Sequence, residues 1–169
     1  MIVARTMGSD LPGSKPDGAF VEDDGGRADA GFKGEAGDCV CRAVAIASGR
    51  GYDTVYNDLA CGTTAQRVTK RSGKRAASAR NGINTSRKWF KDYMACRGFL
   101  WVPTMTIGSG CKVHLHSAEL PTGRLVVMLS RHAAAVIDGV LHDTHDCSRE
   151  GTRCVYGYYI AQPVATSST

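Results

Sequence analysis

A cysteine near the start of the chain and a histidine in its last third are the residue types that acyl-transfer chemistry needs. Cys39 follows the small polar turn Gly37-Asp38 and opens an apolar stretch. His132 stands at the head of an apolar segment that turns back at Asp138-Gly139. A thiolate is a strong nucleophile, and an imidazole is a base near neutral pH. The pair therefore predicts a cysteine hydrolase.

Asp143 is predicted to orient the imidazole. A two-residue type I′ turn at Asp138-Gly139 would fix the register of the hairpin. In that register His132 is a diagonal neighbour of Asp143 on one face, within reach of its side chain. A carboxylate there can hold one ring nitrogen and leave the other for the thiol. Strict register sets His145 directly opposite His132, so a bulge would change the partner.

The position of Cys39 favours a reactive thiol. Asp38 suits the N-cap of a helix, which places Cys39 in the first turn, where the free amides and the helix dipole lower a thiol pKa. Cys41 points to another side of the same turn and is expected to pack. The alternative for both residues is the common one for a free cysteine, a small buried hydrophobe.

Several motifs resemble the papain-like cysteine peptidases. The stretch Gly37-Asp-Cys-Val-Cys-Arg-Ala, the triplet Ser130-Arg-His, residues 136–146 and Val155-Tyr-Gly-Tyr-Tyr are similar to a group of largely uncharacterised phage and bacterial papain-like proteins. The resemblance spans residues 37–160. It implies a papain-like core with Cys39 as nucleophile, His132 as base and Asp143 as orienting residue. It also implies a covalent thioester intermediate, a peptide or protein substrate, and a phage or prophage setting.

One feature departs from that family. Papain-like peptidases usually place a glutamine several residues before the nucleophile to stabilise the oxyanion, whereas residues 32–36 here read Phe, Lys, Gly, Glu and Ala. The backbone amide of Cys39 can donate one hydrogen bond, and loss of a second donor typically costs about 10²–10³ in turnover. A catalytically weak or inactive binding module is therefore the alternative function.

The elements expected to position these residues are helices first and strands second, which predicts an α+β domain with an antiparallel sheet. Helices are expected from Cys39 to Gly49, from residue 53 or 54 to just before Gly62, and from residue 84 or 85 to Cys96. Strands are expected over residues 99–105, 112–116, 125–130, 132–137, 140–144 and 155–161. Residues 1–36 are predicted to be a flexible Gly/Asp-rich lead, residues 37–162 the hydrolase domain, and residues 163–169 a frayed tail.

Composition sets the remaining limits. With 169 residues and 43% hydrophobic content, the chain can bury one core. Seven cysteines, an odd number, and the lack of a secretory signal predict free thiols in a reducing cytoplasm, that of the host if the protein is phage-encoded. No segment approaches the roughly 18 apolar residues of a membrane span, and no cofactor is expected.

Two further sites stay open. His142, His145, Cys147 and Cys154 offer metal-ligand types, although their spacing fits no standard finger and the two histidines have opposite strand parity. Residues 67–97 carry ten of the 21 Lys and Arg side chains of a chain whose net charge is +5, together with Trp89, Phe90 and Tyr93. That stretch would suit weak contact with nucleic acid or an acidic protein. The helical spacing of the three aromatic residues favours burial instead.

Overall fold

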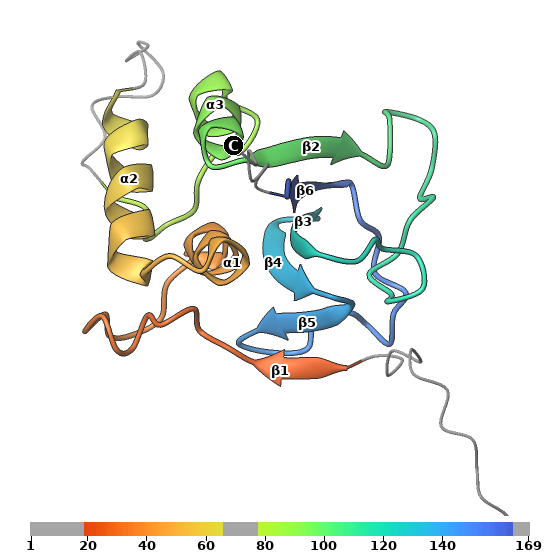
Figure 1. Cartoon of the computed structure of the whole chain (residues 1–169), viewed down its shortest axis with the longest axis horizontal. Coiled ribbons are helices and arrows are strands. Elements are labelled where there is room, and N and C mark those ends of the chain that lie inside the picture. The colour runs from red at the N-terminus through yellow and green to blue at the C-terminus, as the bar shows by residue number, and fades with distance from the viewer. Residues whose placement is uncertain (1–18, 66–77, 164–169) are drawn as a thin grey trace, which may run out of the picture.

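The computed structural model describes residues 19–65 and 78–163. Three helices lie on one side of a sheet of six strands (Figure 1). The helices are α1 (Cys39–Ser48), α2 (Tyr52–Thr64) and α3 (Lys88–Cys96), and the strands are β1 (Phe20–Glu22), β2 (Phe99–Pro103), β3 (Arg124–Leu129), β4 (His132–Ile137), β5 (Val140–Asp143) and β6 (Gly157–Ala161). The predicted α+β class is confirmed.

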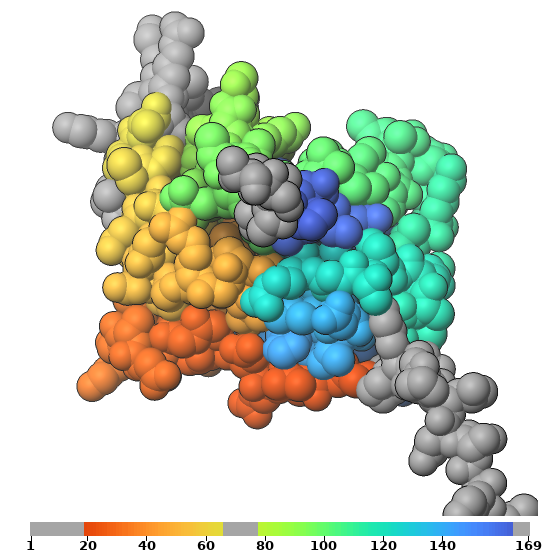
Figure 2. All heavy atoms as spheres, in the orientation of Figure 1, coloured from red at the N-terminus to blue at the C-terminus, as the bar shows by residue number. Residues whose placement is uncertain are grey.

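The sheet is mixed, so the prediction of an antiparallel sheet is wrong in one strand. Its order is β1-β5-β4-β3-β6-β2, and β1 pairs with β5 in parallel while every other pair is antiparallel. Strand β1 comes from the segment predicted to be a flexible lead, and it lies against β5 at the sheet edge in the space-filling view (Figure 2). Its side chains are exposed, so main-chain pairing rather than an apolar pattern holds it there. Residues 1–18 lie outside the described part of the chain.

Small side chains let α1 approach the sheet closely. Ala43 and Ala47 of the helix pack in one buried cluster with Ala133 and Ala135 of β4. A second buried cluster, which includes Val136 and the loop residues around Leu115, lies on alternate positions of the same strands. Because β4 is sandwiched between the two clusters, the first turn of α1 is fixed beside the start of β4.

Helix α2 continues through Gly62, where the sequence predicted that it would stop. A side chain at Gly62 would lie 2.2 Å from the indole of Trp89 on α3. The glycine therefore serves close packing between the two helices rather than a helix end. Helix α3 begins at Lys88, after the turn at Asn84–Ser86, which is later than predicted.

The segment between β2 and β3 departs furthest from its prediction. Residues 112–116 form no strand, only an isolated bridge between His114 and Cys154. Cys111 and Cys154 are joined by a disulfide, so the prediction of free thiols is wrong for this pair. The other five cysteines are free. None of the described helices has the length and apolar character to cross a membrane.

Candidate active site

The hairpin of β4 and β5 has the predicted register. Asp138 and Gly139 adopt φ values of 50° and 86°, as a type I′ turn requires, and Ile137 pairs with Val140. Nε2 of His132 lies 2.5 Å from Oδ2 of Asp143. The diagonal contact inferred from the sequence is therefore present, and no bulge intervenes in the ladder between Ala135 and His142.

Cys39 is the first residue of α1 and is half-buried. It lines one cleft together with His132 and Ala133, the first two residues of β4. Burial by itself raises the thiol pKa, but interactions with the His132 side chain and with the backbone of Ala133, together with the positive charge of Arg42, outweigh it and lower the pKa of Cys39 below its usual value of 9.0. Cys41, two residues on, is fully buried, and burial raises its pKa to about 12. Only Cys39 of these two is suited to attack a carbonyl carbon.

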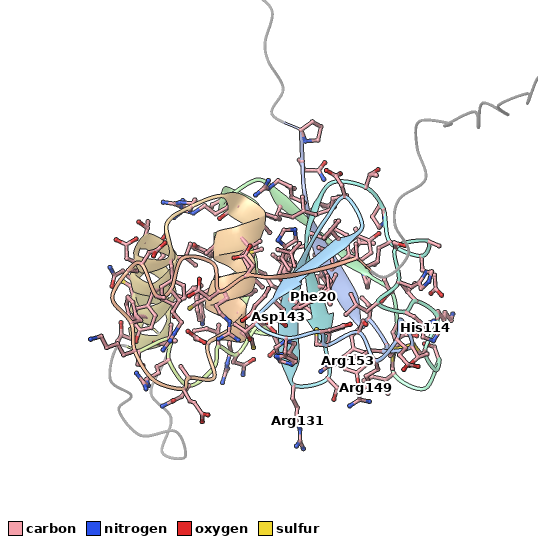
Figure 3. All side chains as sticks on the ribbon, turned by 90° about the horizontal axis from the view of Figure 1, so that it is seen from below. Phe20, His114, Arg131, Asp143, Arg149 and Arg153 are labelled. Carbon is pink, nitrogen blue, oxygen red and sulfur yellow. A yellow bond between two sulfur atoms is a disulfide. The ribbon has the colours of Figure 1, made fainter. Side chains whose placement is uncertain are left out.

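The imidazole of His132 is held in its charged form. Hydrogen bonding to Asp143, then to Cys147 and Cys39, raises the pKa of His132 well above its usual 6.5. Burial favours a neutral Asp143, yet its bond with His132 keeps the pKa of that carboxyl low. Oδ1 of Asp143 also accepts a hydrogen bond of 2.7 Å from the amide of Thr144. The carboxylate is therefore fixed at both oxygens, which fixes the ring. Figure 3 labels Asp143 near the middle of the molecule.

Asp38 acts differently from its prediction. Its side chain does not cap α1. The buried carboxylate instead accepts hydrogen bonds from the guanidinium groups of Arg27 and Arg42 and from the hydroxyl of Tyr52. A buried carboxylate needs such partners, and two cations satisfy it better than the helix amides do. The resulting cluster anchors the residue before Cys39 to the lead segment and to α2.

Within the described residues, one group could hold a metal ion, and it is not the predicted set. Ligand atoms of His132, Asp143 and Cys147 lie within 4.8 Å of one another. Two ligands about 2.0–2.1 Å from one tetrahedral zinc ion would lie roughly 3.3 Å apart. The 2.5 Å contact between His132 and Asp143 fits a hydrogen bond instead. Of the predicted set, Cys154 is in the disulfide and His142 contacts Asp23 at 3.1 Å.

A cleft of about 620 Å³ lies beside Cys39 and His132. Its walls include a loop containing Asn81, the residue before β6, Tyr156, and the side chain of Trp101 on β2. None of these residues belongs to the site predicted from the sequence. Asn81-Gly82 is a turn signal, which would have marked the loop. No local pattern in the sequence connects β2 or β6 to Cys39.

The basic stretch does not form the aromatic surface that nucleic-acid stacking needs. Phe90 is fully buried, and Trp89 and Tyr93 pack against the same cluster, so the expectation of burial is confirmed. Residues 67–77 of the basic stretch, with Lys70, Arg71, Lys74 and Arg75, lie outside the described part of the chain.

Comparisons of the chain with protein-family models, with curated proteins and with solved structures give no match.

Proposed function

We propose that the protein is a cysteine hydrolase of papain-like type, a peptidase or a related thiol acyl hydrolase. The observation that carries this proposal is that Cys39 and His132 line one open cleft, where His132 lowers the pKa of the thiol and is itself held by a 2.5 Å hydrogen bond to Asp143. A thiol at a helix start, a positioned imidazole and a buried carboxylate are the groups that nucleophilic acyl transfer requires.

The proposed reaction has two steps. The Cys39 thiolate attacks the carbonyl carbon of a peptide or related acyl substrate and forms a tetrahedral oxyanion. Nε2 of His132 is bound to Asp143, which leaves Nδ1 to give its proton to the departing amine as the thioester forms. His132 then takes a proton from water, whose oxygen attacks the thioester. The carbon–sulfur bond then breaks, the acid product leaves, and the Cys39 thiolate is restored beside the protonated His132.

Asn81 supports this mechanism as a second oxyanion donor. The first donor is the backbone amide of Cys39, which the first turn of α1 leaves without a helical acceptor. Asn81 lines the same cleft, and its loop lies against Gly37, 3.8 Å from a side-chain carbon placed there. Arg80 fixes this loop by donating a 2.8 Å hydrogen bond to the carbonyl of Glu35. We therefore propose that the side-chain amide of Asn81 takes the place of the missing upstream glutamine.

Replacement of Asn81 by alanine is expected to lower kcat by about 10²–10³, because one oxyanion donor is lost. The rate of Cys39 alkylation should stay unchanged, since alkylation forms no oxyanion. The measurement is hydrolysis of an activated ester such as p-nitrophenyl acetate beside alkylation by iodoacetamide. Asn57→Ala, on the exposed side of α2, is the matched control. Equal turnover in the two variants would remove Asn81 from the mechanism.

Thiol labelling tests the proposed function directly. At about pH 6 an ordinary thiol is mostly protonated, whereas the lowered pKa of Cys39 preserves its thiolate. Iodoacetamide in limiting amount should therefore modify Cys39 before the exposed Cys61 and Cys96. Peptide mapping by mass spectrometry identifies the labelled site. Preferential labelling of Cys61, Cys96 or Cys147 would refute the assignment of the nucleophile.

A further inference from the structure

One wall of the cleft beside Cys39 is an aromatic shelf, formed by Trp101, Tyr156, Tyr159 and Met128. Trp101 and Tyr159 are directly paired across β2 and β6, and their ring centres lie 4.8 Å apart. Trp101 is 38% exposed and Tyr156 is 41% exposed, although both are large aromatic residues. An exposed aromatic surface inside a cleft is typical of a binding site.

The position of the Trp101 ring depends on a glycine. A side chain at Gly157 would lie 2.3 Å from the indole Cη2 and 2.5 Å from Cζ2. The ring therefore extends over the bare backbone of β6, toward Met128, which pairs with Gly157 in the sheet. Because Tyr159 supports the indole from the neighbouring position, the shelf is already formed without a ligand, and binding need not order it.

The charge of the cleft is positive. Lys91 on α3 and Arg131, in the turn between β3 and β4, are among its lining residues. Figure 3 shows Arg131 projecting away from the body of the molecule, where a bound chain can reach it. No carboxylate is among the described residues that line the cleft. Acidic groups on a ligand would therefore meet attraction without a competing carboxylate.

We infer that the aromatic shelf binds an aromatic or large apolar side chain of a peptide substrate, and that Lys91 and Arg131 select acidic residues beside it. This inference rests on the proposed function in one respect. A single-stranded nucleic acid also offers rings and negative charge, but the thiol of Cys39 in the same cleft acts on acyl groups, which peptides contain and nucleic acids lack. Two cations are also few for a phosphate backbone.

Binding is best measured on the full chain with Cys39→Ala, which cannot turn over a substrate. The probe is the blocked peptide acetyl-Asp-Phe-Gly-Gly-amide, compared with versions that carry Lys for Asp or Ala for Phe. The readout is tryptophan fluorescence, since the chain has only two tryptophans and Trp89 packs against Gly62, away from the cleft. We expect the Asp-Phe peptide to bind tightest and to change the emission of Trp101.

Three variants in the Cys39→Ala background separate the contributions. Trp101→Leu should weaken binding of the Asp-Phe peptide by about 10-fold, because an aromatic contact and its buried area are lost. Gly157→Ala should weaken it as well, by displacing a ring that is still present. Leu100→Ala is the matched control, since this exposed neighbour points to the other face of β2 and should change nothing. Calorimetry replaces fluorescence for Trp101→Leu.

The role of charge is tested with the double variant Lys91→Glu, Arg131→Glu. This variant should bind the peptide that carries Lys more tightly than the peptide that carries Asp, the reverse of its parent. Equal affinity of Trp101→Leu and its parent for the peptide would overturn the inference, as would tighter binding of a ten-residue oligothymidylate than of the peptide. Failure of the proposed function gives a different result. If the protein is not a hydrolase, the peptide still binds through Trp101, but the protein with Cys39 intact neither cleaves it nor forms an acyl-enzyme.

Discussion

Replacement of Cys39 by serine is expected to lower the rate of acyl hydrolysis by at least about 10⁴-fold, the scale on which loss of a catalytic nucleophile acts. Serine is close to cysteine in size. Its hydroxyl stays protonated beside His132, so it is a much weaker nucleophile than the Cys39 thiolate. The measurement is hydrolysis of p-nitrophenyl acetate and of peptide amides that carry an aromatic residue. A mass increase that corresponds to a trapped acyl-enzyme should appear in the parent protein and be absent from the Cys39→Ser variant.

The matched control for this experiment is Cys61→Ser, an exposed cysteine on α2. It should hydrolyse the same substrates at the parent rate. Thermal unfolding of both variants should stay close to that of the parent, because neither change opens a cavity in the core. Hydrolysis that persists in Cys39→Ser but falls in Cys61→Ser would place the chemistry elsewhere on the protein.

Replacement of Asp143 by asparagine is expected to reduce turnover by about 10³–10⁴-fold, as the loss of an orienting carboxylate does in a serine-type triad. The amide can donate to Nε2 of His132 and so favours the wrong tautomer, with the proton on the nitrogen that faces Cys39. Asp146→Asn is the control. Asp146 accepts a 2.9 Å hydrogen bond from the amide of Ser148, and its variant should retain activity.

The same variant predicts a shift in pH dependence. Asp143 is the largest cause of the raised pKa of His132, and the charged ring helps to lower the pKa of Cys39. Without the carboxylate, His132 loses its proton at a lower pH, so the pKa of Cys39 rises. The pH below which alkylation of Cys39 slows should therefore move upward in Asp143→Asn and stay in place in Asp146→Asn. A larger change in Asp146→Asn would show that the wrong carboxylate has been named.

Local patterns determined the elements that present the proposed nucleophile and base. The 3.6-residue period from Val40 to Ala47 predicts α1, and the structure has that helix from Cys39. Asp138-Gly139 predicts a two-residue turn, and the turn sets a register that brings His132 to Asp143. These predictions succeed because each depends on residues close together in the chain, where spacing alone fixes geometry.

Contacts between distant segments were decided only by the tertiary structure. Cys147 lies against the His132–Asp143 pair, and Asp38 pairs with Arg27 and Arg42 instead of capping its helix. Neither arrangement follows from spacing, because a side chain's partner depends on which segments pack beside it. Local propensity offers a polar side chain several partners, and burial selects among them.

The sheet and the cleft show the same division. The sequence determined that strands follow helices, but only tertiary pairing added β1 in parallel and joined Cys111 to Cys154. Parallel pairing and disulfides join segments far apart in the chain, so no local pattern specifies them. Trp101 reaches the cleft of Cys39 because β2 pairs with β6. The sequence thus indicated the proposed nucleophile, base and carboxylate, while packing of the helices on the sheet decided what surrounds them.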